Sequence, residues 1–237
     1  MTKRIGIIGG VGPLAAAHFF TRLIQLTPAD HDDDHLPAVV AAEPVPSRIA
    51  HLLGRGPSPL PALLTAARTL AGAGAQLIAI PSATTHGYRD EIAAAVPVPV
   101  LDLLAETGAT LDAIGARRPL LLATAATVGL RLFEPRLPAG TVARYPSAAT
   151  QRRLDRLIDQ VKHGRPVEVL RQRLTDLLRA EDWPDTDCVV LGCTELSVIA
   201  PPVNPLGTPL VDVADVLARA AIRVATSNEK GRADALA

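Results

Sequence analysis

The chain has 237 residues, 48% of them hydrophobic, and its 24 basic and 24 acidic residues give a formal net charge of zero. Neither this balance nor an aromatic content of 3% favours binding to nucleic acid or to an anionic membrane surface. The sequence contains no run of about 18 apolar residues that could cross a membrane. Its first residues lead directly into a strand-like run rather than a signal peptide, so we expect a cytoplasmic protein.

Short apolar runs alternate with longer helical patterns along the chain, which is typical of an α/β protein with parallel sheets. In chain order, the expected strands are residues 4–8, 38–42, 76–80, 98–101, 119–123, 141–145, 187–191 and 208–211. The expected helices are residues 13–25, 60–73, 103–114, 149–163, 167–180 and 213–225. Because the strands are rich in Val, Ile and Leu, we expect both faces of each sheet to be covered.

Two stretches of the chain resemble each other at a nearly constant spacing. Ser82 and Cys193 each follow an apolar run and one small residue, and they lie 193 − 82 = 111 positions apart. Asp102 and Asp212 each end a short apolar run that begins with proline, and they lie 212 − 102 = 110 positions apart. The repeat predicts two similar halves, with Ser82 and Cys193 on opposite sides of a shared cleft.

The repeat also predicts how the chain divides into domains. The predicted fold is α/β, with two pseudo-symmetric three-layer domains, each with a mainly parallel sheet, and the active site in the cleft between them. We assign residues 1–102 plus about 213–237 to the first domain, because the last helix is expected to return to it. Residues 103–212 form the second domain.

Cys193 is the strongest candidate for chemistry. It follows Gly192 at the expected carboxyl end of a strand, where ligand sites of α/β sheets cluster. A free thiol has a pKa of about 8.5 and can donate or accept a proton after modest tuning. The alternative is an inert cysteine at a strand end.

Ser82 is a poor general base, so its role could be nucleophile, hydrogen-bond donor or placeholder. Cys188 is expected to be a core residue without a disulfide.

The glycine-rich residues 9–12 follow the first expected strand and open a helix. They fit the loose dinucleotide-binding pattern, which also needs an acidic residue about 20 positions further on. Glu43, the nearest acidic residue after the second expected strand, lies 43 − 12 = 31 positions beyond Gly12. A turn that offers backbone N–H groups to a small carboxylate is at least as good an interpretation.

Two cations and one acidic stretch remain open to more than one interpretation. Arg48 lies in a proline-stiffened loop and could bind a carboxylate in bidentate fashion, or lie on the surface. Lys162 lies near the end of an expected helix, where a cation is favourable in any case. The acidic residues 30–35 are contiguous rather than spaced to converge, so we expect a solvated loop and no metal site.

Together these residues resemble the cofactor-independent aspartate/glutamate racemase superfamily, on its aspartate racemase branch. The resemblance runs nearly end to end and rests on five motifs in order. They are residues 9–13 (Gly-Gly-Val-Gly-Pro), residues 27–28 with 34–37, residues 44–48 (Pro-Val-Pro-Ser-Arg), Lys162 before Gly164, and residues 191–196 (Leu-Gly-Cys-Thr-Glu-Leu).

The resemblance implies an isomerase that uses neither pyridoxal phosphate nor a metal ion, and that forms a homodimer. In this family two cysteines flank the α-carbon of a small carboxylate substrate, and one removes the proton while the other delivers one. Cys193 would be one of them, with Ser82 opposite it as the second catalytic residue. The residues implied to bind the substrate are Gly10, Arg48, Thr84, Thr85, Thr127, Lys162 and Thr194, with Arg48 and Lys162 at the distal carboxylate.

The chain departs from the family pattern at the first cysteine motif. Ser82 and Ala83 stand where the family has cysteine and asparagine, and Leu130 and Arg131 alter a loop of the second half. Three explanations stay open: a racemase of aspartate or glutamate in which Ser82 or water covers one face, a one-cysteine lyase like the arylmalonate decarboxylases, or an impaired variant. A noncatalytic nucleotide-binding or other ligand-binding protein that uses residues 9–12 is the alternative from another class.

Overall fold

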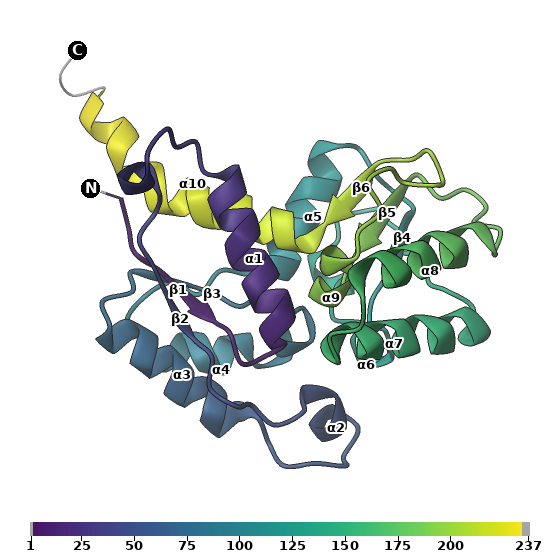
Figure 1. The fold of residues 1–237 in the computed structure, drawn as a ribbon, viewed down its shortest axis with the longest axis horizontal. Coiled ribbons are helices and arrows are strands. Elements are labelled where there is room, and N and C mark those ends of the chain that lie inside the picture. The colour runs from purple at the N-terminus through teal and green to yellow at the C-terminus, as the bar shows by residue number, and fades with distance from the viewer. Residues whose placement is uncertain (1, 234–237) are drawn as a thin grey trace.

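The computed structural model describes residues 2–233, and the side chains of residues 2–227. Two parallel three-stranded sheets organise it (Figure 1). The first has the order β2-β1-β3, with β1 (Ile5–Ile8), β2 (Ala38–Ala41) and β3 (Leu77–Ala79). The second has the order β4-β5-β6, with β4 (Pro119–Leu122), β5 (Cys188–Leu191) and β6 (Leu210–Asp212). The α/β class and the two parallel sheets expected from the sequence are confirmed.

Ten α-helices are described. They are α1 (Pro13–Leu26), α2 (Arg48–Leu52), α3 (Leu60–Gly72), α4 (Arg89–Ala94), α5 (Leu103–Ala113), α6 (Ala125–Gly129), α7 (Ala148–Lys162), α8 (Val167–Arg179), α9 (Thr194–Val198) and α10 (Val213–Ala233). Three 3₁₀ turns, η1 (Asp32–Asp34), η2 (Thr84–Tyr88) and η3 (Glu134–Arg136), complete the chain. The short helices α2, α4, α6 and α9 were not expected from the sequence, because five or six residues are too few to show a helical period.

Two of the expected strands are wrong. Residues 98–101 and 141–145 contribute one bridge each, Ile78 to Val100 and Leu120 to Arg144. Pro99 has no N–H to donate and interrupts the first of them within two residues. The second lies at the edge of its sheet, and Val142 beside Arg144 is 59% exposed, so little apolar burial stabilises a longer pairing.

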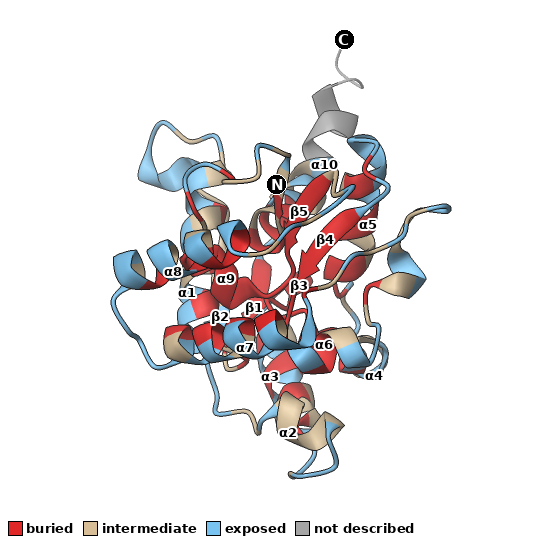
Figure 2. Cartoon of the chain, turned by 90° about the vertical axis from the view of Figure 1, so that its right-hand side faces the viewer, coloured by how far each residue is buried: buried red, intermediate tan, exposed pale blue. Residues whose placement is uncertain are grey.

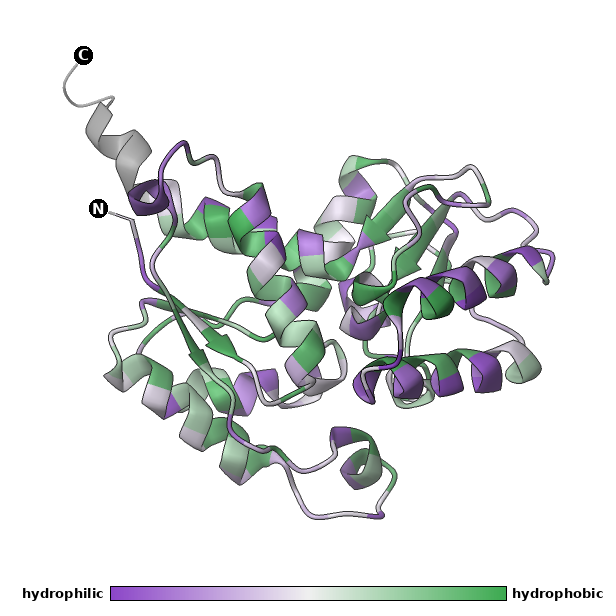
Figure 3. Ribbon diagram, in the orientation of Figure 1, coloured by the Kyte–Doolittle hydropathy of each residue, from purple (hydrophilic) through white to green (hydrophobic). Residues whose placement is uncertain are grey.

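The strands β1, β3, β4 and β5 are buried throughout, whereas β6 is only partly buried. The expected cover on both faces does not extend to the edge strand β2, where Val40 is 44% exposed. Figure 2 shows the buried residues concentrated in the strands and on the inward helix faces. In Figure 3 the strands are hydrophobic, whereas α7 and α8 alternate between hydrophobic and hydrophilic residues. Leu154, Leu157 and Ile158 of α7 and Leu174 of α8 pack in one cluster against β4 and β5.

The helix α10 connects the second sheet with elements of the first half (Figure 1). It begins directly after β6 and contacts α5, α1 and β3. Asp212 caps its first turn, since its Oδ1 accepts a hydrogen bond from the backbone N–H of Ala214 at 2.8 Å. Asp102 caps α5 in the same way, accepting from Leu104 and Ala105. The second pair of the sequence repeat thus has a shared structural role. The proposed domain division stays a prediction, and its residues 234–237 lie outside the described chain.

Candidate functional site

Residues from both halves line one small cavity of about 10 Å³, which is room for roughly one water molecule. Ser82 reaches it from the segment after β3, and Cys193 from the segment after β5. Both positions follow the carboxyl ends of parallel strands, where α/β proteins bind ligands. The lining residues are Arg48, Ile49, Ser82, Ala83, Thr84, Thr124, Lys162, Cys193, Thr194 and Glu195.

Cys193 is 6% exposed and contacts a carboxylate. Its Sγ donates a hydrogen bond to Oε2 of Glu195 at 2.9 Å. Burial raises the pKa of the Cys193 thiol well above its usual value, and the charge of Glu195 raises it further, whereas Lys162 acts in the opposite direction. In this arrangement Cys193 is held as a thiol that can donate a proton. Cys188 is fully buried in β5 and away from the cavity lining.

The glycine-rich turn before α1 makes room for neighbouring groups of the protein. A Cβ atom on Gly12 would lie 2.8 Å from Oε1 of Glu195, and Gly12 has a φ of +128°. A Cβ atom on Gly10 would clash with the backbone oxygen of Glu43. These contacts explain both glycines without a nucleotide, and Gly10 lies outside the set of residues that line the cavity.

The hydroxyl of Ser82 is held by its own segment. Thr85 Oγ1 donates a hydrogen bond to Ser82 Oγ at 2.8 Å. The proton of the Ser82 hydroxyl therefore remains available for a group in the cavity. Thr85 is fully buried and acts on the site through this contact.

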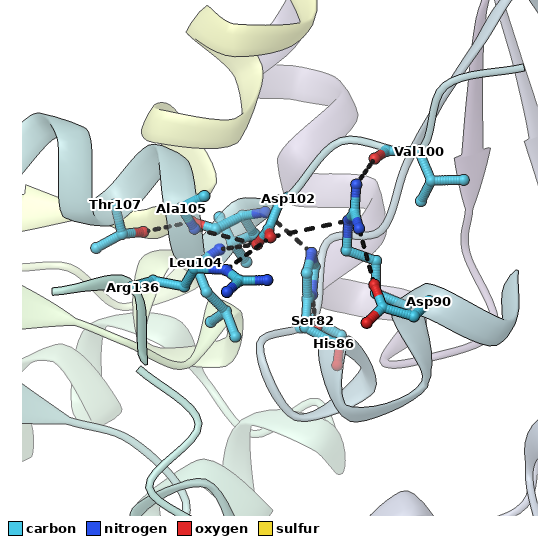
Figure 4. A network of polar contacts seen from close by, with 11 residues as sticks. Ser82, His86, Asp90, Val100, Asp102, Leu104, Ala105, Thr107 and Arg136 are labelled. Atoms are coloured by element: carbon cyan, nitrogen blue, oxygen red, sulfur yellow. Dashed lines mark hydrogen bonds and ion pairs between the residues drawn. The ribbon is translucent and has the colours of Figure 1, made fainter. Parts of the chain in front are cut away.

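His86 joins the Ser82 segment to the start of α5 (Figure 4). The backbone N–H of Leu103 donates to its Nε2 at 3.0 Å, so its Nδ1 carries the proton and donates to the backbone oxygen of Ser82 at 2.9 Å. Burial lowers the pKa of His86. His86 therefore contacts the backbone of Ser82 rather than its hydroxyl, and has a positioning role.

Asp102 completes this network (Figure 4). Its Oδ2 accepts a hydrogen bond from Nε of Arg136 at 3.0 Å. Although burial opposes its ionisation, the N–H of Ala105 and the guanidinium of Arg136 lower the pKa of Asp102. The carboxylate thus remains charged where the Ser82 segment meets α5.

Three buried threonine hydroxyls meet across the two halves. Thr84 Oγ1 lies 2.8 Å from Thr127 Oγ1 and 3.4 Å from Thr124 Oγ1, and the last two lie 3.0 Å apart. Thr124 also caps α6, accepting from the N–H of Thr127. The sequence prediction omitted Thr124. A signal was present, because Thr124 lies just beyond the carboxyl end of β4, as Cys193 lies just beyond that of β5.

The two predicted cations come together at the cavity. Arg48 Nη2 donates to the backbone oxygen of Val11 at 2.7 Å, while its buried Nε has no acceptor among the described residues. Burial lowers the pKa of Arg48, and the nearby Glu195 opposes this. Lys162 reaches the cavity from the last residue of α7. Arg48 lines the cavity, and its unpaired Nε–H is a donor that an anionic ligand of this guanidinium would satisfy.

The nine predicted site residues fall into three groups. Six line the cavity: Ser82, Cys193, Arg48, Thr84, Lys162 and Thr194. Thr85 and Thr127 contact lining residues, and Gly10 lies apart. The sequence prediction missed Thr124, Ile49 and the contact of Glu195 with Cys193.

Among the described residues, no group of three or more His, Cys, Asp or Glu side chains is placed to hold a metal ion. Among the described helices, none combines the length and apolar character that a membrane crossing requires.

Comparisons with known proteins agree with this architecture. The chain is 24% identical over 222 residues to the broad specificity amino-acid racemase RacX of Bacillus subtilis (strain 168), covering 92% of this chain and 96% of that protein. It superposes on the aspartate racemase of Picrophilus torridus with a TM-score of 0.83 at 28% identity, covering 94% of both chains. An aspartate racemase homologue from Pyrococcus horikoshii OT3 has the same fold, with a TM-score of 0.73 at 22% identity over 94% of this chain and 99% of that one. Residues 8–221 match the Asp/Glu/hydantoin racemase family, and the chain therefore belongs to that family.

Proposed function

We propose that the protein is a cofactor-independent racemase that moves a proton at the α-carbon of an acidic amino acid, aspartate or glutamate, with Cys193 as the acid/base. One observation carries the proposal: a single buried thiol shares a small cavity with a serine hydroxyl from the other half and with two cations. Family membership and the amino-acid racemases among its relatives support the same reaction class.

The cavity offers separate groups for the two carboxylates of such a substrate. The free Nε of Arg48 and the ammonium of Lys162 would bind the distal carboxylate. The hydroxyls of Thr84 and Thr124 would face the α-carboxylate, with Thr127 orienting them. Thr194 would offer its backbone, because its hydroxyl already donates to the backbone oxygen of Pro81 at 2.9 Å.

The two faces of the α-carbon would meet groups of unequal strength. Cys193 acts on one face, and the Ser82 hydroxyl, standing where the family carries its first cysteine, is available on the other. A serine hydroxyl can donate a proton, but it is a far weaker acid than a thiol and a poor base unless it is activated. We therefore expect proton exchange to be faster for one enantiomer than for the other.

A second candidate, a one-cysteine lyase that decarboxylates a malonate and protonates the product through Cys193, is favoured by the same single thiol. It predicts a chiral product that carries one solvent deuteron and does not racemise. Homodimer formation and a cytoplasmic location stay predictions.

The test is to incubate the protein in D₂O with each enantiomer of aspartate and glutamate and to follow the α-proton by NMR. C193A is expected to abolish exchange, and C188A, which changes the other buried cysteine, is the matched control. Exchange with one enantiomer only would indicate a one-base site. Full activity in C193A would contradict the assignment, and turnover of malonates alone would establish the lyase.

A further inference from the structure

Glu195 is buried in the cavity wall beside the thiol. It is 5% exposed, and its Oε2 accepts the hydrogen bond from Cys193 Sγ at 2.9 Å. A buried carboxylate is costly unless it is paired or has a function. The backbone geometry supplies this contact, because Glu195 follows Cys193 by two residues in the first turn of α9.

Two features of the first half support the position of this carboxylate. Gly12, at the start of α1, lacks the Cβ atom that would press on Oε1 of Glu195. Arg48 lies close enough for the charges of Glu195 and Cys193 to affect its pKa. The glycine and the cation together provide room and a compensating charge for this buried carboxylate.

Resting on the proposed function, we infer that Glu195 is the proton partner of Cys193 and sets when this cysteine acts as a base. To accept the α-proton, Cys193 must first lose its own. The Sγ–H bond breaks as an O–H bond forms at Oε2 of Glu195. The resulting thiolate then takes the α-proton, so that the Cα–H bond breaks, a new Sγ–H bond forms and the electron pair remains on the substrate. The reverse sequence returns the proton.

In this arrangement Glu195 can hold the proton that Cys193 releases. In the resting state the proton stays on sulfur, because burial and the carboxylate both disfavour the thiolate. Cys193 is then a donor. When Glu195 accepts that proton, the same cysteine becomes an acceptor without requiring a second thiol. Glu195 acts through Cys193 and is therefore a positioning residue.

Direct titration of the thiol tests this inference and needs no substrate. In a C188A background Cys193 is the single thiol of the chain, since the sequence has two cysteines. The rate of alkylation by iodoacetamide is measured against pH in this background and in E195Q. Removing the negative charge is expected to lower the pKa of Cys193 by at least about one unit, a roughly tenfold gain in alkylation rate at fixed pH below the midpoint. An unchanged midpoint in E195Q would overturn the inference.

Two further variants control this result. E106Q makes the same substitution at Glu106, which pairs with Arg223 on the surface, and should leave the midpoint unchanged. If E195Q fails to fold, E195D replaces it in the test. E195D keeps the charge but shortens its reach by one methylene, and it should give a smaller shift of the midpoint in the same direction. α-Proton exchange measured on the same proteins separates the two proposals. A shifted midpoint without turnover contradicts the proposed function alone, whereas turnover with an unchanged midpoint contradicts the role of Glu195 alone.

Discussion

The hydroxyl of Thr194 donates a hydrogen bond to the backbone oxygen of Pro81 at 2.9 Å, across 113 positions of sequence. Pro81 immediately precedes Ser82, and Thr194 immediately follows Cys193. One buried contact thus connects the two segments that carry the proposed reacting side chains. It fixes their separation more directly than either sheet does, because each sheet belongs to one half of the chain.

T194V is expected to weaken both stability and activity. Valine has nearly the shape of threonine but leaves the buried oxygen of Pro81 without its donor, at a cost of about 1–3 kcal/mol in the free energy of unfolding. Urea unfolding measures the stability, and α-proton exchange measures the activity. T194S retains the hydroxyl and should keep most of both. If T194V matches the parent in both measurements, the contact does not hold the site together.

The His86 network predicts a pH dependence of stability. Because burial lowers the pKa of His86 in the folded protein, the unfolded chain binds the proton first as the pH falls below about 6.5. The stability that His86 contributes is complete above that pH and is lost as the pH falls toward its folded pKa. Urea midpoints between pH 7.5 and 5 should therefore decline less steeply in H86Q than in the parent.

Asp212 works against this slope, so the variant comparison is needed. Burial raises the pKa of Asp212 to about 6, and its contribution is present at low pH and lost as the pH rises through about 6. H18Q is a second comparison. Burial also lowers the pKa of His18, but His18 is less buried than His86, so H18Q should change the pH slope less than H86Q does. An identical pH slope in H86Q and the parent would contradict the neutral, doubly hydrogen-bonded state of His86.

G12A is expected to disturb Cys193 from a distance. The substitution places a Cβ atom 2.8 Å from Oε1 of Glu195 and strains a backbone φ of +128°, at a cost of about 1–3 kcal/mol. The carboxylate must move, so the alkylation midpoint of Cys193 should shift as well. G115A is the matched control, because Gly115 has a φ of +71° with open space around it. G115A should lose stability but leave the alkylation midpoint of Cys193 unchanged. The same midpoint in G12A and G115A would contradict the contact between Gly12 and Glu195.

Sequence patterns located the two sides of the site but not the contacts between them. Ser82 and Cys193 were identified because a strand-to-loop position repeats after 111 residues, and two similar halves that face each other would place these side chains on opposite sides of a shared cleft. The pairing of Glu195 with Gly12 joins elements more than 180 residues apart (195 − 12 = 183), and no local period encodes it. Thr124 was missed because its hydroxyl acquires its role only when Thr84 of the other half reaches it.

The errors in the predicted strands have a local cause. An apolar run such as residues 98–101 meets the criterion for a buried strand, but Pro99 removes the donor that would extend the ladder beyond the pair of Ile78 and Val100. The glycine-rich turn was also open to two interpretations, since a glycine can serve a ligand or a neighbouring atom of the protein. Here backbone and side-chain atoms of Glu43 and Glu195 occupy that space.

S82C tests whether a second thiol is what the proposed racemase lacks. The cavity already places Ser82 and Cys193 in its lining, and Thr85 donates to the atom that would become sulfur. A thiol is a far better proton donor and acceptor than a hydroxyl, and a well-placed general acid or base contributes roughly 10²-fold or more. We expect S82C to raise exchange of the slower enantiomer by at least about that factor, with little change for the faster one. Equal acceleration of both enantiomers, or none, would show that Ser82 does not face the substrate opposite Cys193.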